Sequence, residues 1–357
     1  MDITPEQINK EGFSILHGKW GGSRKFHTLI GVGGKREGSG PQVGYLAYPN
    51  VGLKNIIPSS RFYYYDELLS VDKLPVADQK FKTSGSLQQS VTEEQYIQKI
   101  EEIKELLAAG EIYQMCYSIR FRKKFSGNPY ALFLKLSKSN PVDFQAYLNC
   151  GKFQIISSSP ERFFKVSDGK ITTTPIKGTI SKKKEENLQY LLSSEKEQAE
   201  LDMITDLERN DVGKICEYGT LKLKKEREIL ELKNLWHTYS EVEGKLQSDV
   251  GYQEIIDAMF PGGSITGCPK RRAMKYISQL EGLPRNIFTG SIGYISMSND
   301  QLANSQLEMD FNIAIRTILI KDGYLEFWAG GGIVVDSEPE KEYKECLLKA
   351  EKFLGII

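Results

Sequence analysis

The sequence predicts an α+β protein built on antiparallel β-sheet. Two observations lead to this class. Asp322-Gly323 separates two apolar runs, Thr317–Ile320 and Tyr324–Trp328, which is a strong signal for a β-hairpin. The other predicted strands are separated by helices, but not in the regular strand–helix–strand order that a parallel sheet requires. At 357 residues, the chain is long enough for one large domain or two ordinary ones.

Residues 1–90 read as irregular, because glycines interrupt their short apolar runs. These glycines lack the G-x-x-x-x-G-K-[ST] spacing of a phosphate loop, so they indicate turns. The composition changes near residue 90. We therefore expect a short N-terminal segment, residues 1–90, that completes the sheet scaffold, and a more regular core, residues 91–357. The first residues lack the basic and apolar regions of a signal peptide.

The core opens with a predicted helix. Thr92–Gln95 matches a capping box, and Gly110 follows as the helix stop. Between them, apolar residues recur at helical spacing at Tyr96, Ile100, Ile103 and Leu107. A strand is predicted next, over about 112–121, with alternate residues on opposite faces of a sheet.

The later elements follow from similar signals. Phe153–Ile156 predicts a second strand, and a third, β-branched strand ends at Lys177. Helices are predicted at about 194–209 and 339–353. The turn-rich segment 260–269 leads into a further helix.

The composition excludes several classes of function. Lys+Arg and Asp+Glu balance at 47 each, so no global field attracts nucleic acid or a membrane surface. No apolar run reaches the ~18 residues of a membrane span. The five cysteines lie far apart without a C-x-x-C pair, and the three histidines form no zinc motif. We therefore expect no disulfide framework and a reducing compartment, the cytoplasm.

Lys177 occupies a position that favours chemistry. It follows the β-branched run Ile171–Thr174 and Pro175, and it precedes Gly178, where the backbone is conformationally permissive. A lysine amine is a nucleophile when it is neutral. The alternative is a solvated lysine in a loop after a buried strand, which position alone favours. The rest of the chain reverses that preference.

Two predicted helices carry pairs of glutamates three residues apart, so each pair shares a helix face. The pairs are Glu197 with Glu200 and Glu342 with Glu345, and Lys349 continues the second face. Carboxylate oxygens suit Mg²⁺, which takes few protein ligands and keeps several waters. The alternative is two solvated helix faces rich in Glu and Lys.

Three elements in the last hundred residues favour an anion. Arg316 lies within the apolar run 311–320, and its planar guanidinium suits a carboxylate. Gly330–Gly332 allow close approach to backbone N–H groups. The loop Ser264–Cys268 precedes a helix N-terminus, where N–H groups point outward. The alternative for each is an ordinary ion pair or turn.

Glu161 and Lys177 form a candidate acid/base and nucleophile. Each lies just past a predicted strand end, sixteen residues apart. Adjacent strands would bring the two side chains into one pocket. Taken alone, a glutamate after a proline is usually a turn residue.

These residues belong to motifs that together resemble the chorismate-utilising enzymes. The resemblance covers about residues 90 to 357, with the motifs in the family's order. They are Gly110–Gln114, Ser159–Glu161, Pro175–Thr179, Lys196–Glu200, Asp206–Gly213, Phe260–Gly267, Phe288–Gly290, Gly330–Val334 and Glu342–Glu345.

The resemblance implies large antiparallel sheets layered with outer helices, and Mg²⁺-bound chorismate between the sheets. It implies Mg²⁺ ligands at Glu200 and Glu345, with Glu197 and Glu342 close by, and a general acid/base at Glu161. It implies substrate contacts at Gln114, Gly178, Thr179, His237, Thr266, Arg316, Gly330, Gly331, Gly332 and Lys349.

Two positions separate the branches of this family. Water-adding members carry a lysine base where this chain has Gln114, whereas amine-adding members resemble this chain. Anthranilate-forming members typically have alanine at the position of Lys177, and members that aminate C4 of chorismate have lysine. The resemblance therefore implies C4 amination on the way to p-aminobenzoate and folate. It also implies that a separate glutamine amidotransferase subunit supplies the ammonia.

The chain departs from the family pattern in two places. The Leu-Glu-Ser-type motif of a tryptophan pocket is absent from the N-terminal third, and Phe288 replaces a common tyrosine. Two alternatives stay open: the anthranilate-forming branch, and a chorismate-binding subunit or sensor without activity.

Overall fold

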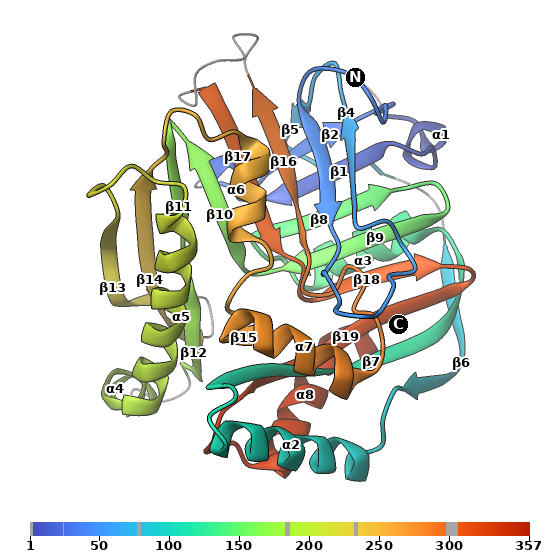
Figure 1. Cartoon of the computed structure of the whole chain (residues 1–357). Helices are drawn as coiled ribbons and strands as arrows, with labels where there is room; N and C mark the ends of the chain where they lie inside the picture. The colour runs from blue at the N-terminus through green and yellow to red at the C-terminus, as the bar shows by residue number, and fades with distance from the viewer. Residues whose placement is uncertain (1–2, 24, 77–79, 183–185, 232–234, 298–305) are drawn as a thin grey trace. The chain divides into compact units, whose positions relative to one another are not determined.

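Figure 1 shows the fold of the chain in a computed structural model. The structure describes residues 3–23, 25–76, 80–182, 186–231, 235–297 and 306–357. The chain folds as two units. Unit 1 consists of Met1–Pro160, Ile265–Tyr294 and Asn312–Ile357, and unit 2 consists of Glu161–Ser264 and Ile295–Phe311. The predicted division near residue 90 stays a prediction.

Unit 1 is built on a ten-stranded antiparallel sheet. Its strand order is β15-β7-β19-β18-β9-β8-β1-β2-β5, and β6 also pairs with β7. The strands are β1 (Phe13–Gly18), β2 (His27–Gly31), β5 (Leu69–Val71), β6 (Phe81–Gln89), β7 (Gln114–Gly127), β8 (Phe144–Asn149), β9 (Phe153–Ser159), β15 (Gly267–Cys268), β18 (Thr317–Lys321) and β19 (Tyr324–Ile333).

The predicted hairpin is confirmed. Lys321 on β18 pairs with Tyr324 on β19, which leaves Asp322 and Gly323 as a two-residue turn. Both turn residues have positive φ, 51° and 75°. This is the type I′ geometry that Asp-Gly favours, because its twist matches the twist of the strands.

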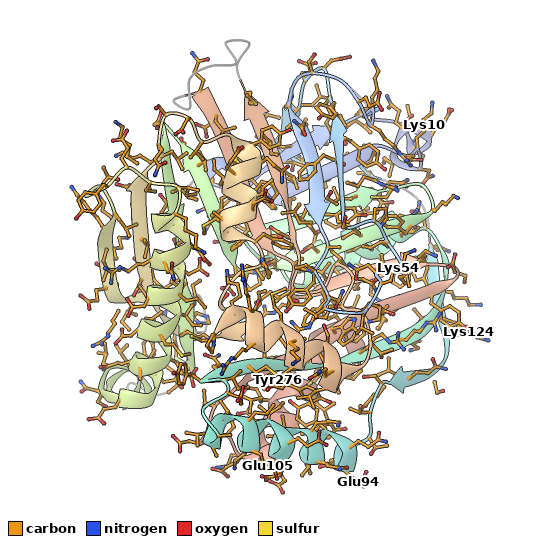
Figure 2. The ribbon with its side chains drawn as sticks, in the orientation of Figure 1. Lys10, Lys54, Glu94, Glu105, Lys124 and Tyr276 are labelled. Carbon is orange, nitrogen blue, oxygen red and sulfur yellow. The ribbon has the colours of Figure 1, made fainter. Side chains whose placement is uncertain are left out.

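The helices of unit 1 are α1 (Pro5–Ile8), α2 (Glu93–Ala108), α3 (Pro129–Ser139), α7 (Lys270–Glu281) and α8 (Pro339–Leu354), with a 3-10 turn, η1 (Trp20–Gly22). The predicted capping box is confirmed: Thr92 Oγ1 accepts from the backbone N–H of Gln95, whose side chain accepts from the backbone N–H of Thr92. Tyr96, Ile100 and Ile103 are buried. By contrast, Glu94 and Glu105 on α2 are exposed to solvent (Figure 2).

The N-terminal ninety residues are more regular than their glycine-broken pattern indicates. They form β1, β2, β5 and β6 of the ten-stranded sheet, together with the paired strands β3 (Gln42–Leu46) and β4 (Ser60–Tyr64). β3 pairs with β4 on one side and with β16 (Ser291–Met297) on the other. Side chains from β1, β3, β8 and β9 pack into one hydrophobic core, with Trp20, Tyr45 and Ile155 fully buried.

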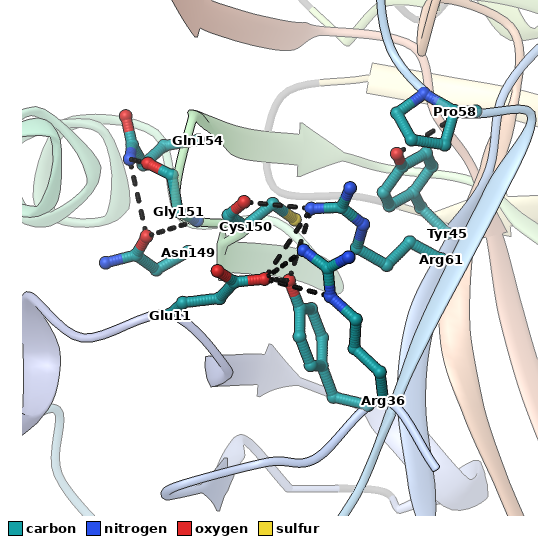
Figure 3. Close-up of polar contacts among 10 residues, drawn as sticks. Glu11, Arg36, Tyr45, Pro58, Arg61, Asn149, Cys150, Gly151 and Gln154 are labelled. Atoms are coloured by element: carbon teal, nitrogen blue, oxygen red, sulfur yellow. Dashed lines mark hydrogen bonds and ion pairs between the residues drawn. The ribbon is translucent and has the colours of Figure 1, made fainter.

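A polar network fixes the N-terminal strands to the turn between β8 and β9 (Figure 3). Arg36 donates from Nη2 to Glu11 Oε1 at 2.6 Å, and Tyr63 Oη donates to the same oxygen at 3.0 Å. Arg61 Nη1 donates to the carbonyl oxygen of Cys150 at 2.9 Å. Burial raises the pKa of the Cys150 thiol to about 12, so the thiol stays protonated at neutral pH.

Unit 2 contains strands in the order β12-β14-β11-β10-β17, and β13 also pairs with β14. The strands are β10 (Arg162–Ser167), β11 (Lys170–Thr173), β12 (Ile176–Ser181), β13 (Lys222–Glu231), β14 (Leu235–Lys245) and β17 (Leu307–Ile313). Its helices are α4 (Glu186–Ser193), α5 (Glu195–Gly213) and α6 (Tyr252–Met259).

The α+β class is confirmed, because every strand pair with a described register is antiparallel and the helices follow no strand–helix–strand repeat. The last predicted helix is confirmed as α8, and Ser194 caps the predicted helix α5. In the described part of the chain, every helix is too short or too polar to cross a membrane.

Candidate active site

Three of the predicted site segments meet at one end of the ten-stranded sheet in unit 1. β15 pairs with the first residues of β7, so Cys268 lies opposite Gln114. β19 pairs with the same end of β7, with Gly332 opposite Cys116 and Gly330 opposite Ser118. β18, the next strand, begins at Thr317, directly after Arg316.

Gln114 is the most unusual residue at this end of the sheet. Its side chain is fully buried, and neither amide atom has a hydrogen-bond partner among the described residues. A Cβ added to Gly332 would lie 2.3 Å from Gln114 Nε2, so the glycine makes room for the amide. A buried amide without partners costs about 1–3 kcal/mol. A ligand that offered the amide both a hydrogen-bond donor and an acceptor would remove this destabilisation.

Helix α8 brings charged groups to the two preceding glycines, Gly330 and Gly331. A Cβ added to Gly331 would lie 3.4 Å from Glu342 Oε2 and 3.5 Å from Lys349 Nζ. Lys349 Nζ donates to the carbonyl oxygen of Gly330 at 3.0 Å and forms an ion pair with Glu345 at 2.7 Å. Figure 1 shows α8 and α2 alongside β7 and β19. A cation and two carboxylates thus lie close to half-buried glycine backbone.

Two ionisable side chains near helix α8, Cys346 and Tyr96, are neutral at pH 7. Cys346 Sγ donates to the carbonyl oxygen of Ala329, and burial raises the pKa of this thiol to about 12. Burial likewise raises the pKa of the Tyr96 hydroxyl far above its usual value. Neither group carries a charge at neutral pH.

Arg316 lies at a turn rather than inside a strand. The apolar run 311–320 divides into the end of β17 and the start of β18, and Arg316 in the connection has a φ of +49°. Its side chain is half-buried, and its carbonyl oxygen accepts from the N–H of Ser158. The placement at the sheet end agrees with the predicted anion contact, which stays a prediction.

The loop before α7 differs from its prediction. Gly267 and Cys268 form the short strand β15, so part of the loop is used in pairing with β7 instead of remaining open for an anion. Thr266 is fully buried, and its carbonyl oxygen accepts from the N–H of Cys116. Thr266 therefore lies next to the strand that carries Gln114.

In unit 2, Lys177 is the second residue of β12, so the prediction that a strand ends at Lys177 is wrong. The strand continues because Gly178 forms a bulge with a φ of +59°, after which Thr179 pairs with His237. Lys177 pairs with Thr238, whose Oγ1 donates to the Lys177 carbonyl oxygen at 2.8 Å. The Lys177 side chain is half-buried.

Glu197 lies beside this bulge. A Cβ added to Gly178 would lie 3.1 Å from Glu197 Oε2 and 2.7 Å from Leu191 Cδ1, so only glycine fits there. Glu197 and Glu200 lie on the first turns of α5 and are both half-buried. His237 is half-buried on β14, and the side chain of Thr179 lies outside what the structure describes.

Glu161 precedes β10 and is held on both sides. Ser264 Oγ donates to Glu161 Oε1 at 3.4 Å. The next residue, Arg162, forms two bonds to the fully buried carboxylate of Asp310, at 2.9 and 3.1 Å. The predicted adjacency of the strands that precede Glu161 and carry Lys177 is wrong, because β9, which precedes Glu161, belongs to the ten-stranded sheet, whereas β12 pairs with β14 in the other sheet.

Two sets of supporting contacts were not among the predictions. Glu208 on α5 accepts from the N–H of Gly263 and from Thr173 Oγ1, each at 3.3 Å, and thereby holds the loop that carries Ser264. Arg285 and Glu281 form a fully buried ion pair in unit 1. The i, i+4 spacing of the latter pair could have indicated it, but Gly282 and Pro284 interrupt the helical pattern.

The four predicted glutamates supply the oxygen donors that a hard divalent cation prefers. Glu342 and Glu345 belong to unit 1, and Glu197 and Glu200 to unit 2. Glu342 accepts from Ser337 Oγ at 2.8 Å, and Glu345 pairs with Lys349. Within the described ranges, no group of three or more His, Cys, Asp or Glu side chains is arranged to hold a metal ion.

The chain matches known proteins over most of its length. The sequence pattern of a family described as chorismate binding enzyme matches residues 54–355. Aminodeoxychorismate synthase component 1 of Bacillus subtilis (strain 168) is 38% identical over 76% of this chain and 57% of that protein. Anthranilate synthase component 1 of Aquifex aeolicus (strain VF5) is 37% identical over 74% of this chain and 53% of that protein. The matched part spans little more than half of these relatives.

A solved structure supports the fold alone. The menaquinone-specific isochorismate synthase MenF of Escherichia coli superimposes with a TM-score of 0.78 at 17% identity, covering 98% of this chain and 89% of that protein. At this identity the likeness concerns the arrangement of strands and helices. It agrees with the α+β fold of antiparallel sheets described above.

The packing of Gln114 against Gly332 predicts a specific coupling. Gly332→Ala should destabilise the fold by about 1–3 kcal/mol, because the new methyl group overlaps the buried amide. In a Gln114→Ala background the same change should cost less, with a coupling of about 0.5–3 kcal/mol in chemical denaturation. Gly331→Ala is the matched control, since its Cβ would make ordinary contacts. Equal costs for Gly332→Ala in both backgrounds would contradict the packing.

Proposed function

The chain belongs to the family of chorismate binding enzymes, and on that premise we propose that it aminates chorismate at C4. The product would be 4-amino-4-deoxychorismate, and the protein would act as an aminodeoxychorismate synthase component. The ammonia would come from a glutamine amidotransferase partner.

One residue carries the choice of reaction. Overall sequence identity does not distinguish the C4-aminating branch from the anthranilate-forming branch, because the two relatives are 38% and 37% identical to this chain. Lys177 in Pro175–Thr179 is the residue that the C4-aminating branch has where the anthranilate-forming branch has alanine. Gln114 is the residue that amine-adding members have where water-adding members have lysine. Gln114 therefore favours addition of an amine over addition of water, and Lys177 favours C4 as the carbon that receives it.

The proposed chemistry uses Lys177 as a transient nucleophile. Its neutral amine attacks C2 of chorismate, the two ring double bonds shift, and the C4–O bond breaks. Ammonia then attacks C4, the double bonds shift back, and the C2–N bond to Lys177 breaks. The sum replaces hydroxyl by amino and releases one water. Lysine suits both steps, because an amine is a nucleophile and, once protonated, a leaving group.

Glu161 is the proposed acid for the departing oxygen. A carboxyl group protonates the C4 hydroxyl as it leaves, and the resulting carboxylate accepts a proton from the attacking ammonia. Ser264 Oγ donates to this side chain, and the Arg162–Asp310 pair holds the neighbouring residue in place. Glu208 fixes the loop that carries Ser264 through the N–H of Gly263.

Unit 1 supplies the proposed substrate contacts. Gln114 offers a buried donor and acceptor, Lys349 offers a cation, and the backbone at Gly331 is open to close approach. Arg316 and Thr266 lie at the same end of the sheet and suit the carboxylates of chorismate. Gly178, Thr179 and His237 are the proposed contacts from unit 2.

The carboxylate oxygens of the four glutamates are the kind of donor that Mg²⁺ prefers. Glu200 and Glu345 are the proposed ligands, with Glu197 and Glu342 beside them, and Glu345 would exchange its pairing with Lys349 for the metal. When bound, Mg²⁺ would anchor a chorismate carboxylate and stabilise developing negative charge.

A second candidate is anthranilate synthesis, which the 37% identity to anthranilate synthase component 1 of Aquifex aeolicus supports. It differs in the carbon that receives the amino group. It also needs no lysine at position 177.

Product identification tests the proposed reaction. With chorismate, Mg²⁺ and ammonium, the chain should form a product that gives p-aminobenzoate only after a lyase is added. Chromatography with mass detection checks this outcome. Direct appearance of fluorescent anthranilate would contradict C4 amination. Binding of chorismate in calorimetry without any turnover would support a sensor instead.

The covalent step makes a separate prediction. In the absence of ammonia, quenched enzyme should carry an adduct whose mass equals chorismate less one water. Lys177→Ala should lack the adduct, because it removes the attacking amine. Lys182→Ala is the matched control, since Lys182 lies next to β12 but pairs with Glu231. An adduct that persists in Lys177→Ala would exclude this lysine as the nucleophile.

A further inference from the structure

Arg285 and Glu281 form a fully buried ion pair in unit 1, outside every motif assigned above. The guanidinium and carboxylate side chains are 0% and 1% exposed. Arg285 Nη2 donates to Glu281 Oε1 at 2.6 Å, and Nε donates to Oε2 at 2.8 Å. Removing these charges from water costs free energy, so a buried ion pair is weak evidence of added fold stability. We therefore consider what else its geometry does.

The surrounding backbone and side chains supply further hydrogen-bond partners for both Arg285 and Glu281. Arg285 Nη2 also donates to the Cys116 carbonyl oxygen at 2.9 Å, and Nη1 donates to the Ile265 carbonyl oxygen at 3.1 Å. Nη1 further donates to Thr289 Oγ1 at 3.0 Å. All five N–H groups of the arginine are therefore used. Glu281 Oε1 in turn accepts from the N–H of Ser118 at 3.0 Å.

The bonded segments are those that carry the proposed substrate contacts. Cys116 lies two residues after Gln114, and its N–H donates to the carbonyl oxygen of Thr266. Ile265 directly precedes Thr266. These contacts place one guanidinium between two neighbouring site segments.

A third segment is reached through Thr289. Its Oγ1 accepts from Arg285, and its N–H donates to the carbonyl oxygen of Ala314, two residues before Arg316. Thr289 has a φ of +56°, so its backbone is held in a conformation that few side chains favour. Arg285 thus bonds directly to the segments of Cys116 and Ile265, and reaches the segment before Arg316 through Thr289.

We propose that the Arg285–Glu281 pair is a positioning device that sets where Gln114, Thr266 and Arg316 stand relative to the substrate. This inference rests on the proposed function of that site. A planar guanidinium with five fixed donors holds several carbonyl groups in one geometry, whereas a lysine with one ammonium group holds fewer. A displacement of about 1 Å at such groups is enough to cost ~100-fold in rate.

Hydrogen–deuterium exchange of the substrate-free chain tests the positioning directly. Arg285→Lys should raise exchange in peptides covering residues 112–118 and 264–268, because the carbonyl contacts at Cys116 and Ile265 are lost. Arg61→Lys is the matched control, since Arg61 also donates to a carbonyl oxygen in unit 1, at the turn between β8 and β9. Exchange at both peptides that equals the wild type in Arg285→Lys would overturn the proposal.

Kinetics then separate positioning from stability. Arg285→Lys should lower kcat/KM for chorismate by roughly 10- to 100-fold. The double variant Glu281→Leu/Arg285→Met removes both charges at similar volume, so its melting midpoint should recover relative to Arg285→Met. The kcat/KM of the double variant should remain low, and its hydrogen–deuterium exchange in the two peptides should remain high. Recovery of kcat/KM together with the midpoint would mean that the pair only stabilises the fold.

The two proposals fail in different ways. If the wild-type chain left chorismate unchanged, the proposed function would be wrong, while the exchange comparison would still decide whether the pair holds its two segments. If the wild type converted chorismate and Arg285→Lys showed unchanged exchange and kinetics, the positioning role alone would be wrong.

Discussion

The fully buried amide of Gln114, which lacks a protein partner in the described part of the chain, is the constraint on which this account depends. Folding normally pairs such groups, because an unpaired one costs about 1–3 kcal/mol. Here the sheet leaves space for it, since Gly332 on the neighbouring strand has no side chain that would meet the amide. Because this unpaired amide lies at the end of the sheet that carries the proposed substrate contacts, we infer that a ligand group pairs with it.

The rest of unit 1 keeps this arrangement rigid. β7 runs through the middle of it, paired with β15 and β19 at its first residues and bonded to the Arg285–Glu281 pair at Cys116 and Ser118. Unit 2 has its own rigid elements, in which the bulge at Gly178 fixes Lys177 and a chain of bonds from Glu208 to Ser264 fixes Glu161. In each unit the proposed chemistry depends on residues whose contacts are local to that unit.

Local signals in the sequence predicted local structure well. The Asp322-Gly323 turn and the Thr92 capping box are determined by neighbouring residues, so their patterns were sufficient. Long-range order was harder. The strand with Lys177 does not end there, because a glycine bulge lets pairing continue, and no pattern indicated that this strand and the one before Glu161 belong to different sheets. The Arg285 pair escaped prediction because its contacts lie 20 and 169 residues away along the chain.

Calorimetric titration of Gln114→Leu with chorismate and Mg²⁺ tests the central claim most directly. Leucine is similar in volume but has no amide, so the substrate-free variant should fold at least as stably as the wild type. Its chorismate affinity should fall by about tenfold or more, since a ligand group would lose its buried partner. Affinity equal to that of the wild type would show that the unpaired amide does not contact the substrate, and would contradict the account.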